Sequence, residues 1–182
     1  VSAEVKTASI TINAINDIPT TENKTIEINE DEAYVFTLGD FKFNDVDKND
    51  VLTTVKIESL PSFGVIKLNG KAVSEGVIIT KANIDAGLLT YITAQDGFGK
   101  PYTTFTFSVN DGTANSIPAT ITLNATDTND APTAIAWASG GSVAEDKIST
   151  SSVSTIVGKL SATDPNTGDT LRFVQLSNNK FV

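Results

Sequence analysis

Apolar and polar residues alternate with a period of two along most of this chain. A period of two places every second side chain on the same face of an extended strand. The alternating segments are also rich in Thr, Val, Ile and aromatic residues, which favour strands. They are TASITIN (7–13), KTIEIN (24–29), VLTTVKIE (51–58), LLTYIT (88–93), TTFTFSVN (103–110) and PATITLN (118–124).

Clusters of Gly, Asn and Asp separate these segments and predict turns. Within GVIKLNGKAVSEGVIIT (64–80), the pair Asn69-Gly70 predicts a tight hairpin turn between two short strands. The segment TKANIDAGL (80–88) is the one helix-like stretch; Thr80 is suited to cap it and Gly87 to end it, so we expect a single turn. Short strands at this spacing predict an all-β fold, an antiparallel β-sandwich.

The chain also contains an internal repeat. TASITINAINDIPT (7–20) aligns with PATITLNATDTNDAPT (118–133), and DVDKNDVL (45–52) aligns with DPNTGDTL (164–171). Asn-Glu-Asp at 29–31 corresponds to Ala-Glu-Asp at 144–146, and the offsets of 113, 115 and 119 residues indicate one repeating unit. We therefore expect three pieces: the last strand and linker of a preceding repeat (1–16), one complete repeat (17–130), and the first half of a following repeat (131–182).

Composition narrows the function. The 182 residues include 22 acidic and 13 basic ones, for a formal charge of −9, and no Cys or His. A chain this acidic does not suit nucleic acid, because phosphate binding needs a basic face. No run of 18 apolar residues is present, so we expect no membrane insertion in this segment. Without His, Cys or a Gly-x-Ser-x-Gly motif, we expect no enzyme activity.

Several motifs resemble those of cadherins. TDTNDAPT (126–133) resembles the linker between cadherin repeats, VAED (143–146) resembles the glutamate motif after a first strand, and LSATDPNTGDTL (160–171) resembles the Ala-x-Asp-x-Asp segment, with Asn166 in place of the second Asp. Residues 59–112 are similar to the proteoglycan-type cadherin-like repeat of large bacterial adhesins. The resemblance implies tandem Greek-key sandwiches, Ca²⁺ in the linkers, and a secreted or cell-surface protein that serves in adhesion.

Calcium suits these residues chemically. Ca²⁺ takes six to eight oxygen ligands, which Asp, Glu, Asn and backbone carbonyls supply. Following the strands of the expected sandwich places two acidic clusters at opposite ends of the complete repeat. One comprises Asn16, Asp17, Asp45, Asp47 and Asp111. The other comprises Glu30, Asp96, Asp127, Asn129 and Asp130, and meets Asp164 and Asn166 of the next repeat.

The resemblance adds Glu145, in the VAED motif, to the candidate ligands. The first linker is two residues shorter than the second and has no Asp at the place of Asp127, so we expect it to bind its ion more weakly. Asn166 also lowers the charge of the site that it joins. A solvated turn is an equally good explanation of the loop 44–50, and a turn-stabilising role is an equally good one for Asp96 and Asp111.

The functional hypothesis is a calcium-rigidified extender or adhesion segment, whose partners are the neighbouring repeats of the same chain. The alternative is a β-sandwich module that binds a carbohydrate or a surface protein. An exposed aromatic patch with polar groups nearby would favour that alternative.

Overall fold

The computed structural model describes residue 10 and residues 15–132, 136–139 and 159–166. The chain divides into two compact units, of which the first ends at Thr126 and the second begins at Asp127. Among the described residues, no helix is long and apolar enough to cross a membrane. The predicted strand at 7–13 lies outside the described residues, apart from Ile10.

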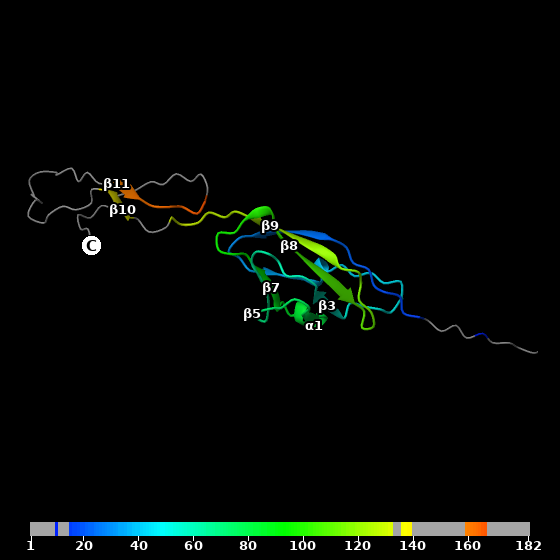
Figure 1. The fold of residues 1–182 in the computed structure, drawn as a ribbon. Coiled ribbons are helices and arrows are strands. Elements are labelled where there is room, and N and C mark those ends of the chain that lie inside the picture. Colours follow the sequence, from blue (N-terminus) through cyan, green and yellow to red (C-terminus); the bar gives the residue numbers. More distant parts are fainter. Residues whose placement is uncertain (1–9, 11–14, 133–135, 140–158, 167–182) are drawn as a thin grey trace, which may run out of the picture. The chain divides into compact units, whose positions relative to one another are not determined.

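The first unit is a sandwich of two sheets (Figure 1). The five-stranded sheet has the order β1-β9-β8-β3-β6, and the four-stranded sheet has the order β2-β7-β4-β5. The strands of the first sheet are β1 (Lys24–Asn29), β3 (Thr54–Ile57), β6 (Ile78–Thr80), β8 (Gly99–Asn110) and β9 (Ala119–Thr126). Those of the second are β2 (Tyr34–Val35), β4 (Val65–Leu68), β5 (Lys71–Ala72) and β7 (Leu89–Ile92). The all-β sandwich predicted from the alternation is therefore confirmed.

Alternation along each strand builds the core between the sheets. In β9, every second residue from Ala119 to Ala125 is buried, and in β8 the same holds for Phe105, Phe107 and Val109. Aromatic rings fill the centre, where Phe36 packs edge-on against Phe105 with ring centroids 5.8 Å apart. Neighbouring pairs in the first sheet are antiparallel except β1 with β9, which run parallel from Lys24 opposite Ile121 to Asn29 opposite Thr126.

Two short helical turns complete the unit. The helix α1 (Lys81–Asp85) begins where Thr80 accepts a hydrogen bond from the N–H of Asn83, and the chain leaves it at Gly87 with φ of +68°. This confirms the predicted single turn. The 3-10 turn η1 (Leu38–Asp40) follows Thr37 and was not expected from the sequence pattern.

The second unit contains the described strands β10 (Ala136–Ser139) and β11 (Lys159–Ser161), which pair antiparallel. Trp137 lies opposite Leu160 in this pair. The predicted boundaries of three repeats remain predictions.

Candidate cation site

The first unit gathers its predicted acidic residues at the end where the chain enters it. A two-way pair of backbone hydrogen bonds between Thr20 and Asn44 fixes the entering linker beside the loop that follows Asn44. The N–H of Asp17 donates to Asp47 Oδ2 at 2.8 Å, and the N–H of Asp47 donates to Asp45 Oδ1 at 2.8 Å. Linker and loop are therefore connected through carboxylates.

The loop between β8 and β9 brings Asp111 to the same end. A bridge between Asn110 and Asn115 shapes this loop, and the amide of Asn16 donates to Asp111 Oδ2 at 3.1 Å. The structure thus brings together the five residues predicted for this end, from three segments of the chain.

Asp50, from the same loop as Asp45 and Asp47, also lies in this group. Oxygens of Asp45, Asp50 and Asp111 lie within 4.8 Å of one another; we call these three residues the Asp45 cluster. Two oxygens on one Ca²⁺, each about 2.3–2.6 Å from it, lie at most about 5.2 Å apart, so each pair of these carboxylates has the spacing of two ligands on one ion. Asp45 Oδ2 is buried and has no hydrogen-bond partner among the described residues. A buried carboxylate oxygen without a partner is costly unless a ligand satisfies it.

Asp50 was missed by the sequence analysis, which named only Asp45 and Asp47 from their loop. Its signal was present in the run Asn-Asp-Val-Asp-Lys-Asn-Asp (44–50). The backbone of Asp50 donates to the carbonyl of Asp47 at 3.1 Å, and this turn directs the chain back toward the cluster. A cavity of about 350 Å³ opens beside it, lined by Ile15, Asn16, Asp47, Lys48, Asn49 and Asp50.

The electrostatics of the cluster differ between its members. Loss of hydration, together with the negative charges of Asp45, Asp47 and Asp111, raises the pKa of Asp50. For Asp111 loss of hydration also opposes ionisation, but hydrogen bonds from the N–H groups of Ala114 and Thr113 and from Asn16 hold its pKa below the usual value. Carboxylates this close to one another repel, and a cation between them would relieve that repulsion.

The opposite end of the first unit holds two other predicted ligands. The buried Glu30 follows β1, and its N–H donates to the carbonyl of Thr126 at 3.1 Å. Asp96 lies exposed in the turn before β8 with φ of +52°. Pairing of Gly99 with Ala125 places this turn near the end of β9.

In the second unit, Asn166 connects the linker residues to the loop after β11. Its side-chain oxygen accepts from the N–H of Asp130 at 2.6 Å, and its amide donates to Asp127 Oδ1 at 2.6 Å and to the carbonyl of Thr128 at 2.7 Å. The N–H of Asn166 donates to Asp164 Oδ1 at 3.0 Å. Four of the predicted ligands in this unit thus lie together.

Comparison with known proteins identifies the first unit. The profile of the family described as "Bacterial Ig domain" matches residues 16–124, well over half of the chain. The chain belongs to the bacterial Ig domain family. No curated protein and no solved structure matches it. Ig-like domains of this kind usually occur in extracellular or surface proteins of bacteria, and they are typically structural and non-enzymatic modules.

The match refines the resemblance drawn from sequence motifs. It supports an Ig-like module of a bacterial surface protein, and is not specific to cadherin-like repeats or their adhesins. The matched residues begin at Asn16 and end at Asn124, so they span the whole Asp45 cluster and the sheets that position it.

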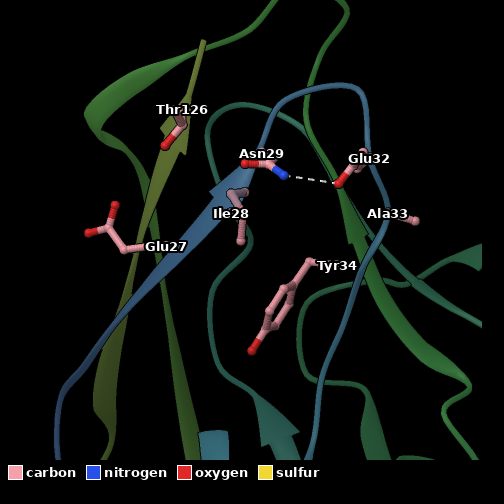
Figure 2. Close-up of a pocket in the computed structure, with 7 residues that line it drawn as sticks. All are labelled: Glu27, Ile28, Asn29, Glu32, Ala33, Tyr34 and Thr126. Carbon is pink, nitrogen blue, oxygen red and sulfur yellow. Dashed lines mark hydrogen bonds between the residues drawn. The ribbon is translucent and has the colours of Figure 1, made fainter. Parts of the chain in front are cut away.

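This bacterial Ig domain also has a small cavity of about 230 Å³ between β1 and the start of β2 (Figure 2). Tyr34 forms one wall, and the amide of Asn29 donates to Glu32 Oε2 at 3.1 Å. Figure 2 shows Glu27 on the other side of β1 from Glu32. Glu27 pairs with Lys100 at 3.1 Å, so the two glutamates do not converge on one ion.

Glu145 and Asn129 are the remaining predicted ligands. Glu145 lies outside the described residues. The side chain of Asn129 donates to the carbonyl of its neighbour Asp130 at 3.1 Å, which uses its amide within the linker.

Proposed function

We propose that this bacterial Ig domain is an extender module of an extracellular bacterial surface protein, stiffened by Ca²⁺ where successive modules join. The observation that supports it most is the Asp45 cluster, three carboxylates from two loops within the span of one ion. Its ligand atoms are all oxygens, as Ca²⁺ requires, and the chain has no Cys or His for a softer metal.

The cluster offers a mechanism for stiffening. Asn16 and Asp17 of the entering linker bond directly to Asp111 and Asp47. Without a cation the carboxylates repel one another, which favours an open arrangement of linker and loops. With a cation, the same charges become ligands, and the binding energy orders the linker against the domain.

Calorimetric titration of the 182-residue chain with Ca²⁺ tests the site. Asp45→Asn removes the charge of the carboxylate with the buried, unpartnered oxygen and should weaken binding by at least about tenfold, which corresponds to about 1.4 kcal/mol. Glu75→Gln, in the exposed turn before β6, is the control and should leave the affinity unchanged. Equal affinity for the parent chain and Asp45→Asn, or no binding by the parent chain, would contradict the site.

The extender role needs its own measurement. Small-angle scattering of several units in tandem should give a larger maximum dimension with Ca²⁺ than with a chelator. An unchanged dimension would mean that bound calcium does not stiffen the chain.

One observation favours the alternative, a ligand-binding module. Phe63 is 58% exposed, and its ring centroid lies 5.8 Å from that of Tyr102. The hydroxyl of Tyr91 donates to the carbonyl of Phe63 at 2.8 Å, and the N–H of Ala94 donates to the hydroxyl of Tyr102 at 3.1 Å, so both residues are anchored. An anchored, exposed aromatic pair suits stacking on a flat, uncharged ligand such as a neutral sugar ring.

A glycan array probed with the chain and with Phe63→Ala tests this second function. Loss of signal for neutral glycans in the variant would favour it. An array without signal for the parent chain would leave the extender role as the better account.

A further inference from the structure

The repeat seen in the sequence reappears as a repeat of hydrogen bonds. In what we call the first joint, Asp17 N–H donates to Asp47 at 2.8 Å, and Asp47 N–H donates to Asp45 at 2.8 Å. In the second joint, the aligned residues make the same two bonds. Asp130 N–H donates to Asn166 at 2.6 Å, and Asn166 N–H donates to Asp164 at 3.0 Å. The two joints therefore share one hydrogen-bonding arrangement between linker and loop.

They differ in the loop side chain that accepts the hydrogen bond from the linker. Asp47 has only acceptor oxygens, whereas the aligned Asn166 also carries an NH₂ group. That group donates to Asp127 Oδ1 at 2.6 Å and to the carbonyl of Thr128 at 2.7 Å. Asn166 is only 9% exposed. The amide has one orientation that serves all three partners, because Asp130 N–H needs an acceptor and the other two groups need donors.

The amide and its carboxylate partner occur together. The first linker is two residues shorter and has no Asp at the place of Asp127, and there the loop residue is the carboxylate Asp47. The second linker has Asp127, and there the loop residue is Asn166. The side chain that can donate, Asn166, is therefore found in the joint whose linker provides the additional acceptor, Asp127.

We propose that the Asn166 side chain does in the second joint what a cation does in the first: it draws linker oxygens and a loop together. Ca²⁺ then orders the first joint, while the second keeps its linker bonds without metal. This reverses the order of calcium dependence expected from linker length. It rests on the proposed function only for the first joint, since the bonds of Asn166 stand on their own.

Hydrogen exchange at single backbone amides, followed by NMR on the whole chain, tests the proposal in the presence of Ca²⁺ or a chelator. In the parent chain, chelation should speed exchange at Asp17 and Asp47 by at least about tenfold and leave Asp130 within about twofold. Asn166→Asp is nearly isosteric but cannot donate, so in chelator its Asp130 amide should exchange at least about tenfold faster, and Ca²⁺ should restore it. Asn166→Ala should lose the protection without recovery.

Amides of β8 in the first unit serve as the internal control for folding and should not change in either variant. The proposal would be overturned if chelation sped exchange at the Asp130 amide of the parent chain as strongly as at Asp17. It would also be overturned if, in chelator, Asn166→Asp left the exchange rate of the Asp130 amide unchanged. Failure of the calcium site gives a different pattern, in which Asp17 and Asp47 ignore Ca²⁺ while Asn166→Asp still loses protection at Asp130.

Discussion

At the scale of single residues, Asp40 is a carboxylate held by many hydrogen bonds, and it is only 3% exposed. Its carboxylate accepts from Lys24 at 2.7 Å, from the hydroxyl of Tyr34 at 3.1 Å, and from both the N–H and hydroxyl of Thr37 at 2.8 and 3.0 Å. Burial opposes ionisation, but the bonds from Lys24 and Thr37 outweigh it and hold the pKa of Asp40 below its usual 3.8.

Asp40→Asn should lower the free energy of unfolding by about 2 kcal/mol, because hydrogen bonds to a buried charge are lost. A group with a lowered pKa stabilises the fold above its ordinary pKa, and that contribution disappears as pH falls through the lowered value. The difference between parent and variant should therefore be full at pH 7, shrink as the pH falls below 3.8, and be lost once the pH is below the lowered pKa of Asp40. Urea unfolding across pH measures it, and Asp85→Asn, which breaks an exposed pair with Lys81, should cost under about 0.5 kcal/mol.

The contribution of Asp50 to stability should depend on pH in the opposite direction to that of Asp40. Its pKa is raised by loss of hydration and by three neighbouring carboxylates, so its favourable contribution is present only at acid pH and is lost as pH rises through the raised value. In chelator at pH 7, Asp50→Asn should therefore raise the midpoint of thermal unfolding. With Ca²⁺ it should lower the midpoint, because a ligand is missing. A variant that shifts the midpoint in the same direction under both conditions would show that Asp50 does not contact the ion.

At the scale of elements, alternation was sufficient to locate the long strands. β9 buries every second residue, and β8 does so from Thr103 to Val109 with Ser108 buried in addition. The pattern could not locate β2, which has two residues and pairs with β7 far along the chain. It also missed η1, although Thr37 and Asp40 have the spacing of a capping box. The sequence pattern also did not indicate Asp50 as a ligand, because the turn within its loop determines which carboxylates lie close together.

Substitutions of two glycines near the β4–β5 hairpin allow the cost of backbone strain to be compared with the cost of a steric clash. Gly70 has φ of +75° and open space where a Cβ would lie. Gly64 has a similar φ of +72°, but a Cβ there would lie 2.2 Å from the hydroxyl of Tyr91. Gly70→Ala should cost about 1–2 kcal/mol from the left-handed backbone alone. Gly64→Ala should cost clearly more, since Tyr91 must also give up its bond to Phe63. Equal costs in urea unfolding would show that the structure around Tyr91 yields freely.

At the scale of the whole molecule, the formal charge is −9. Carboxylates lie close together in the Asp45 cluster and among the linker residues of the second unit. Self-repulsion of this kind weakens a compact state and is screened by salt. The fold class, and the gathering of acidic residues from several segments at one end of the first unit, could be predicted from sequence. The pairing of Asn166 with Asp127 could not, because it depends on where a side-chain amide points once a linker and a loop have met.

Screening and binding make different predictions for thermal unfolding. In chelator, raising NaCl from 20 to 300 mM should raise the unfolding midpoint gradually, because the Debye length falls from roughly 20 Å to roughly 6 Å. Without chelator, 2 mM CaCl₂ adds little ionic strength, so a comparable or larger rise requires a bound ion. Mg²⁺ at the same concentration is the matched control and should act less, since it demands near-octahedral geometry and retains its water. If CaCl₂, MgCl₂ and NaCl gave one curve against ionic strength, the acidic loops would act only as diffuse charge, and the Asp45 cluster would bind no ion.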